Sequence, residues 1–200
     1  DAPDSAFGDP QELPFRHVYG VSPDGLRLTV AATDESIAEA TRLARGDAFD
    51  EPEPGSYAVL VADAATQHLK LDDFAISADD HTLYYSVRSL EAAVPYPLRV
   101  SKRSGSEAWP VGVTLQACEL KANGDYRPHP TAVSADGLTL FYVDSARGKT
   151  RAAFRASLDA DFSWFSDLPG LAQAQPNAAC DRLYYAPAMG NAGLLAAARK

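Results

Sequence analysis

The sequence predicts an all-β fold made of four similar antiparallel sheets. Three observations carry this prediction: a turn phrase that recurs along the chain, alternation of apolar and polar residues after each turn, and an aromatic landmark between turns. With 200 residues, of which 46% are hydrophobic, the chain is long enough to bury one substantial core. We therefore expect a single domain over residues 1–200.

The recurring phrase has the pattern Ser-x-Asp-Gly-x-x-Leu. It stands at residues 22–28 and 134–140, with variants at 77–83 and 179–183. Asp-Gly between apolar runs is typical of a tight hairpin, because Gly accepts a positive φ and Asp hydrogen-bonds its own backbone. The alternating, β-branched and aromatic residues that follow each turn predict a strand.

The aromatic landmark predicts the outer strand of each unit. It occurs at residues 7–13, 109–115 and 162–168, and a fourth copy begins at 49–52 and then diverges. A third strand-like segment precedes the landmark, as at 97–101 and 152–156. Each unit is thus expected to hold about four strands.

Residues 34–46 support two interpretations. Their good helix formers and the final Gly46 favour a helix, whereas the register of the repeat aligns residues 37–43 with the third strands of the other units. We favour the strand, because tertiary context often overrides local propensity.

The order of the units predicts a ring. The chain ends in a third-strand pattern with no outer strand after it, and it begins with an outer-strand landmark that has no unit before it. Pairing these segments gives a four-bladed β-propeller of four-stranded antiparallel blades, with units 14–55, 56–115, 116–168 and 169–200 plus 1–13. Such closure removes exposed strand edges.

The turn phrases at 22–28, 77–83, 134–140 and 179–183 resemble the repeat of TolB-type, or WD-repeat-like, bacterial β-propeller proteins. The resemblance covers nearly the whole chain, although four blades are fewer than usual for that family. It implies a propeller fold, a role in binding or scaffolding and occasionally catalysis, and a periplasmic or cell-surface location.

Composition excludes some classes of partner. The formal net charge is −9, which disfavours nucleic acid and anionic membrane surfaces. No apolar run approaches the roughly 18–20 residues that span a bilayer, so no membrane insertion is expected. The start at Asp1 fits a mature exported form or a cloned fragment. Cys118 and Cys180 fit either a disulfide or two buried thiols.

No catalytic signature is found. The acidic pairs at 72–73 and 79–80 are expected in turns and caps, since neighbouring side chains of a strand point to opposite faces. The basic residues of the third strands and their loops are expected to be solvated edge residues, with anion binding as the alternative. They are Arg99, Lys102, Arg103, Arg147, Lys149, Arg151 and Arg155.

The histidines give the sharpest hypothesis for a site. His17 and His129 each stand five residues before the Ser of their turn, and Asp72 takes this place in the second unit. Since alternate blades face each other across a channel, we expect both imidazoles and the carboxylate near one channel mouth, as ligands of a copper or zinc ion. The alternative is that both histidines hydrogen-bond buried backbone groups. His68 and His81 are expected to be solvated.

The leading functional prediction is a non-catalytic, exported propeller that binds a metal ion, a small ligand or a protein partner. A protein-interaction scaffold without metal is the first alternative. A hydrolase or lyase that uses channel His and Asp as general base and acid is the second.

Overall fold

The computed structural model of the chain describes residue 15 and residues 18–22, 24–31, 37–89, 98–105, 107–116, 128–145, 147–169, 171–176, 182–187 and 195–198. In the last three ranges the description covers the backbone only. Cys118, Cys180, His17 and the expected closing strand at residues 1–13 lie outside the described residues.

The described strands form four antiparallel sheets in sequence order. Sheet 1 contains β1 (Val18–Val21), β2 (Arg27–Ala31) and β3 (Ile37–Thr41). Sheet 2 contains β4 (Leu69–Ile76), β5 (Thr82–Ser89), β6 (Leu98–Lys102) and β7 (Val113–Thr114). Sheet 3 contains β8 (Pro128–Val133), β9 (Thr139–Asp144), β10 (Lys149–Phe154) and β11 (Trp164–Leu168). Sheet 4 contains β12 (Leu171–Pro176), β13 (Arg182–Pro187) and β14 (Leu195–Ala198). The all-β prediction is confirmed, apart from one short helix.

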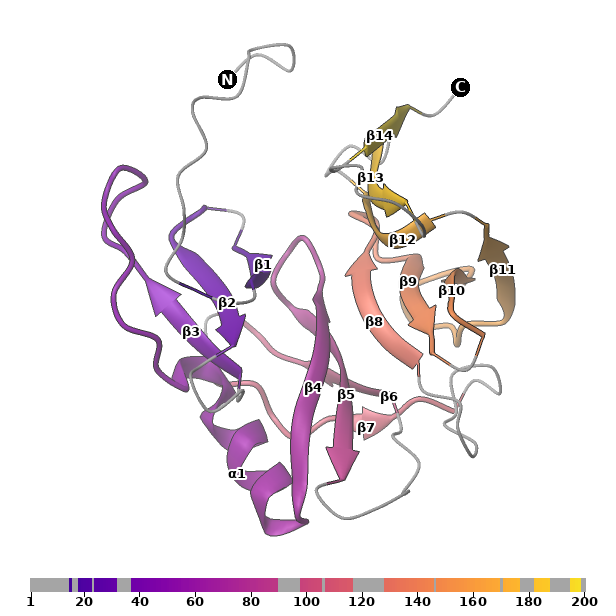
Figure 1. Cartoon of the computed structure of the whole chain (residues 1–200). Coiled ribbons are helices and arrows are strands. Elements are labelled where there is room, and N and C mark those ends of the chain that lie inside the picture. Colours follow the sequence, from indigo (N-terminus) through magenta and orange to yellow (C-terminus); the bar gives the residue numbers. More distant parts are fainter. Residues whose placement is uncertain are drawn as a thin grey trace.

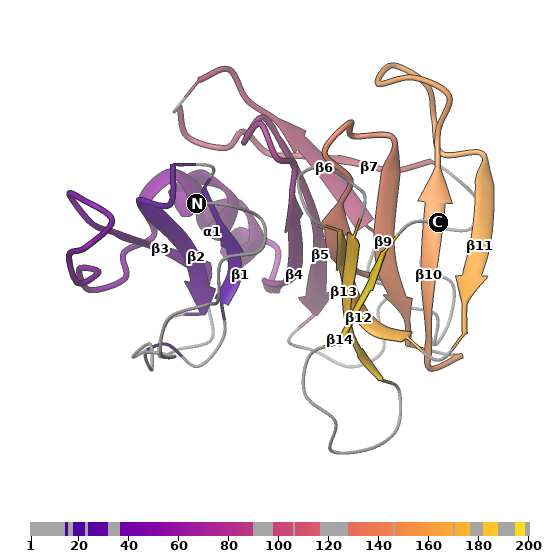
Figure 2. The ribbon, with the colours of Figure 1, turned by 90° about the horizontal axis from the view of Figure 1, so that it is seen from above.

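The first strands of the four sheets lie next to one another. β1 lies beside β4, β4 beside β8 and β8 beside β12. Figure 1 shows sheet 1 on the left, sheet 2 in the middle and sheets 3 and 4 on the right, and the view from above shows sheet 1 apart from sheet 2 (Figure 2). Within the described strands, sheets 1 and 4 do not pair with each other.

Sheet 1 differs from the expected four-stranded unit. Beyond β3, only an isolated antiparallel bridge joins Glu39 to Glu53. The chain then turns through a short 3-10 helix (Gly55–Tyr57) into α1 (Ala58–Thr66), which the sequence did not predict. The helix forms because this stretch is rich in alanine and places Leu60 and Ala64, both buried, one turn apart on one face. No described helix has the length and apolar character to cross a membrane.

The strand interpretation of residues 34–46 is confirmed over β3. Its residues pair in register with β2, from Arg27 opposite Thr41 to Ala31 opposite Ile37. Ile37, Ala38 and Ala40 are buried, so packing within the sheet outweighs the helix propensity of this segment.

The three described turns of the repeat share one hydrogen-bond pattern. In the first, the Leu26 N–H donates to the Asp24 carboxylate (2.9 Å) and the Arg27 N–H donates to the Ser22 hydroxyl (2.9 Å). The same bonds occur around Asp79 and Asp136. The turn role expected for Asp79 is confirmed, whereas the same expectation is wrong for Asp72 and Asp73, which lie within β4.

The arginine that follows each third strand clamps its turn. Arg42, Arg103 and Arg155 each donate from Nε to a turn carbonyl, at 2.9, 3.0 and 2.9 Å. Each guanidinium also lies over the landmark aromatic of its own sheet, with centroid distances of 4.4, 4.1 and 5.1 Å to Phe49, Trp109 and Phe162. The expectation that Arg103 and Arg155 are solvated edge residues is therefore wrong. Cation–π contact and hydrogen bonding hold them instead.

Tyr84 and Tyr85 point to opposite faces of β5. Tyr85 belongs to the apolar cluster that contains Trp109 and Leu83. Tyr84 belongs to a second cluster, which contains Phe162 and residues of sheet 3. The pair thus packs sheet 2 against both of its neighbours.

Candidate functional site

Three side chains of metal-ligand type meet between sheets 2 and 3. One ligand atom from each of Asp72, Asp73 and His129 lies within 4.8 Å of the others, and all three residues are half-buried. Asp72 and His129 were both predicted as ligands, and the structure brings them together with Asp73, which was not.

A β-bulge explains why the two neighbouring aspartates act together. The register of β4 against β5 shifts between Leu71, opposite Val87, and Phe74, opposite Tyr85. Three steps on β4 thus match two steps on β5, and the strict alternation of side chains is lost at Asp72 and Asp73. The expectation that neighbouring strand carboxylates cannot cooperate is therefore wrong at this position.

Bulges recur in the first strand of every sheet. The register shifts between Val18 and Gly20 in β1, between Pro130 and Ala132 in β8, and between Ala172 and Gln175 in β12. Since bulges re-aim side chains and are over-represented beside functional sites, they make the first strands the natural place for a site.

The cluster has defined polar partners. His129 Nδ1 contacts the Asp73 carboxylate directly. The backbone N–H of Asp73 donates to the Ser86 hydroxyl (3.1 Å), which fixes the bulged segment to β5. The Arg88 guanidinium lies 3.9 Å from the Asp72 carboxylate and supplies a positive charge at the edge of the cluster.

His17 does not enter this description, because it lies outside the described residues. The proposed arrangement of His17 and His129 across a channel thus stays a prediction. His68 and His81 are exposed, as expected.

A cavity lies where the ends of β1, β4 and β8 meet. Its volume is about 240 Å³, and residues from sheets 1, 2 and 3 line it, among them Arg27, Glu39, Tyr57, Asp80 and Thr131. Tyr57 is buried, and its hydroxyl is 2.7 Å from the Thr29 hydroxyl. Burial raises the pKa of the Tyr57 phenol, so the hydroxyl is neutral at physiological pH.

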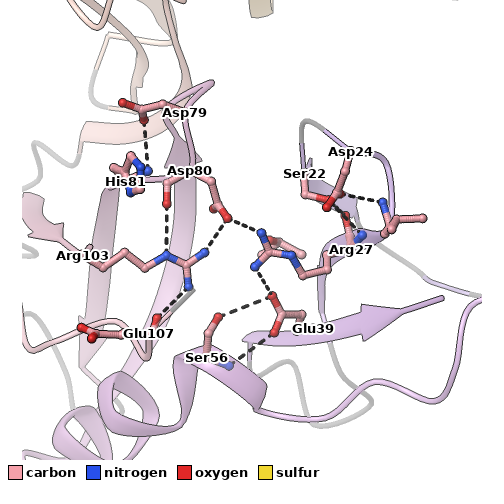
Figure 3. A network of polar contacts seen from close by, with 12 residues as sticks. Ser22, Asp24, Arg27, Glu39, Ser56, Asp79, Asp80, His81, Arg103 and Glu107 are labelled. Carbon is pink, nitrogen blue, oxygen red and sulfur yellow. Dashed lines mark hydrogen bonds and ion pairs between the residues drawn. The ribbon is translucent and has the colours of Figure 1, made fainter. Parts of the chain in front are cut away.

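Asp80 is the centre of the charged network at this cavity. Figure 3 shows its carboxylate between two guanidinium groups, those of Arg27 from sheet 1 and Arg103 from sheet 2. The bond from Arg103 Nη2 measures 2.6 Å. Arg27 also lies 3.4 Å from Glu39, whose carboxylate is in turn near Ser56. The network joins sheet 1 to sheet 2.

Sequence reasoning missed the role of Asp80, although a signal was present. Asp80 stands where the other turns have glycine, with φ of 61° compared with 73° at Gly25 and 70° at Gly137. A non-glycine residue in this conformation is strained, and such residues gather at functional or bridging positions. The aspartate in place of the repeat's glycine thus indicates the residue that joins sheet 1 to sheet 2.

Comparisons with known proteins identify no family. No family model matches the chain, and no curated protein matches it. Among solved structures, the chain is similar to the "putative TolB" of Agrobacterium tumefaciens, with a TM-score of 0.44 and 14% sequence identity. The match covers 83% of this chain and 52% of that one, so the chain spans about half the length of that protein.

Proposed function

We propose that this chain is a non-catalytic binding domain that holds one zinc or copper ion at Asp72, Asp73 and His129. The observation that carries the proposal is the convergence of two carboxylates and one imidazole from the neighbouring strands β4 and β8. Ligands of one zinc ion, each about 2.1 Å from the metal, lie roughly 3–4 Å from one another. The three ligand atoms now lie within 4.8 Å of one another, so binding an ion would require side-chain rotations that bring them to that spacing.

The chemistry of the three groups supports a transition metal. Imidazole suits zinc and copper, whereas calcium and magnesium prefer oxygen ligands alone. The Asp73 carboxylate that contacts His129 Nδ1 either binds the ion itself or orients the imidazole so that the other ring nitrogen binds. Arg88 lowers the affinity for a cation, because its charge lies 3.9 Å from Asp72.

The fold that would present this site is the closed four-bladed propeller, with residues 1–13 completing the last unit. Support comes from the order of the four sheets and from the clamp arginines. Arg199 follows β14 as Arg42 follows β3 and Arg103 follows β6, and Phe7 begins the N-terminal landmark as Phe49 begins another. In a closed ring His17 is a further ligand for the ion. By the resemblance of its turns, the protein works in the periplasm or at the cell surface.

Calorimetric titration with Zn²⁺ and Cu²⁺ tests the site. Asp73→Asn and His129→Gln should each weaken metal binding at least tenfold, because each removes a ligand or its orienting partner. His81→Gln, an exposed histidine of the same sheet as Asp73, is the matched control and should leave the affinity unchanged. If His17 is a further ligand, His17→Gln should also weaken metal binding in this titration.

Unchanged stoichiometric binding in both Asp73→Asn and His129→Gln would refute the site. Circular dichroism of each metal-free variant separates loss of a ligand from loss of fold. Metal-independent capture of a defined protein partner by the wild-type chain, without any metal uptake, would instead support the scaffold interpretation.

A further inference from the structure

We propose a second binding site, independent of the metal site, for the carboxylate of a small organic acid between sheets 2 and 3. The site is a cavity of about 260 Å³ on the side of the repeated turns. Its lining includes Thr82, Tyr84, Lys102, Gly137, Arg155 and Leu158.

This cavity is the repeat equivalent of the one beside Asp80. By the register of the turns, Gly137 corresponds to Asp80, Arg155 to Arg103 and Tyr84 to Thr29. Several equivalent positions therefore line both cavities, among them those of Arg27 and Thr82, of Thr29 and Tyr84, and of Asp80 and Gly137. The first cavity shows how the second binds its ligand.

Beside the first cavity, the carboxylate of Asp80, which lines that cavity, satisfies the clamp arginine Arg103. Arg103 uses Nε and Nη1 for the carbonyls of Asp80 and Glu107, and Nη2 for the Asp80 carboxylate. Arg155 likewise uses Nε and Nη1, for the carbonyls of Gly137 (2.9 Å) and Leu158 (3.0 Å). Among the described residues no carboxylate pairs with Arg155, because position 137 has no side chain. A Cβ built on Gly137 would lie 3.6 Å from Arg155 Nη2 and 2.7 Å from Leu158 Cδ2, so the place of the Asp80 carboxylate is within reach of this donor once the end of the Leu158 side chain moves aside.

Tyr84 supplies the second donor. Its side chain is buried and lines the cavity, yet its hydroxyl has no hydrogen-bond partner among the described residues. The equivalent hydroxyl in the first cavity, that of Thr29, is paired with Tyr57. Burial raises the pKa of the Tyr84 phenol, so it stays protonated and donates. An unpaired buried hydroxyl is costly, and a bound acceptor removes that cost.

The other residues that line the cavity indicate which charge and shape of ligand it would bind. Lys102 is exposed at the rim and supplies a second cation. Asp79 and Asp136 also line the cavity, but both accept bonds within their own turns. Hydrogen bonds from Ser134 and then from the Leu138 N–H hold the pKa of Asp136 below its usual value, so this carboxylate stays charged. Arg103 also lines the cavity, but the Asp80 carboxylate pairs with it. Since Asp79 and Asp136 are engaged within their turns, the charges of Lys102 and Arg155 remain for a ligand and favour an anion, and Val133, Ala135 and Leu158 provide apolar contact for its body.

Butyrate is the probe, with inorganic phosphate as the comparison. Calorimetry and chemical-shift perturbation should show that the wild-type chain binds butyrate and binds phosphate more weakly. Tyr84→Phe should weaken butyrate binding roughly five- to tenfold, the effect of one hydrogen bond. Tyr85→Phe, the same change at a buried tyrosine on the other face of β5, is the matched control and should leave the affinity unchanged.

Gly137→Asp provides the second test, because it restores the arrangement of the first cavity. The new carboxylate should occupy the place beside Arg155 and abolish butyrate binding. Gly25→Asp, at the equivalent φ in sheet 1, carries the same backbone cost away from the cavity and should bind butyrate like the wild type.

The proposal is overturned if the wild-type chain does not bind butyrate, or if Tyr84→Phe binds it as tightly as the wild type does. Phosphate bound as tightly as butyrate would overturn the carboxylate assignment in favour of general oxyanion binding. Should Gly137→Asp fail to fold, the Tyr84→Phe comparison still decides. None of these outcomes depends on metal binding, so failure of this proposal and failure of the metal site are distinguishable.

Discussion

The boundary between sheets 1 and 2 and the boundary between sheets 2 and 3 use equivalent backbone positions but different side chains. At the first, Asp80 reaches across to Arg27 and holds Arg103, and Thr29 pairs with Tyr57. At the second, Gly137 replaces the aspartate, and the Tyr84 hydroxyl is left without a described partner.

The difference separates what the repeat determines from what it leaves open. Turn hydrogen bonds and the arginine clamp recur wherever the repeat is described, and they determine the backbone. The bridge at Asp80 is a departure from the repeat, whereas the bulge at Asp72 and Asp73 has counterparts in the first strands of the other sheets. Asp80 has a positive φ at a position where the other turns have glycine, and such local strain indicates a specific role for the residue.

Removing the bridge should give the largest effect. In Asp80→Asn the guanidinium of Arg103, whose side chain is 1% exposed, loses its carboxylate, and Arg27 loses its contact with sheet 2. We expect the free energy of unfolding, measured in urea, to fall by about 3 kcal/mol, as for other broken buried ion pairs. Asp80→Gly should lose about 1 kcal/mol less, because glycine relieves the positive φ.

Glu107→Gln is the control for this comparison. Only the backbone carbonyl of Glu107 accepts from Arg103, so the same carboxylate-to-amide change there should have little effect. A loss below about 0.5 kcal/mol in Asp80→Asn would show that the network does not hold the two sheets together.

Much of the fold could be predicted from the sequence because the repeat constrains it. The turns followed from Ser, Asp and Gly at fixed spacing, and β3 followed from register even though its residues favour a helix. α1 could not be predicted in this way, since it falls where the aromatic landmark at residues 49–52 diverges and the register ends.

The candidate site was predicted in part. The offset from the turn selected Asp72 and His129, which the structure brings together. Asp73 was missed because alternation assigns it to the other face, and one extra residue in a strand has no sequence signal of its own. Asp80 could have been found, because an aspartate at the glycine position of a repeat is visible in the sequence.

Deleting one hydroxyl from each of two neighbouring tyrosines should change stability in opposite directions. Tyr84→Phe removes a buried hydroxyl without a described partner, so the free energy of unfolding should rise by about 1 kcal/mol. Tyr85→Phe removes the acceptor of the Gly112 N–H (3.0 Å) and should lower it by about 1 kcal/mol. Thermal and urea unfolding of both variants without ligand measure the difference. A loss of stability in Tyr84→Phe would mean that its hydroxyl is already satisfied in the folded chain.

The smallest expected effect is a coupling energy at the boundary between the last unit and the first. Phe7 and Arg199 lie outside the described residues, but a closed ring predicts between them the clamp seen at Arg42 and Phe49. A double-mutant cycle of Arg199→Gln and Phe7→Leu should give a coupling energy of about 0.5–1 kcal/mol, the contribution of one cation–π contact. The cycle of Arg42→Gln and Phe49→Leu is the internal reference, since that pair is 4.4 Å apart. If the reference pair couples while Arg199 and Phe7 are additive, the ring is not closed by residues 1–13, and His17 then loses its predicted place opposite His129.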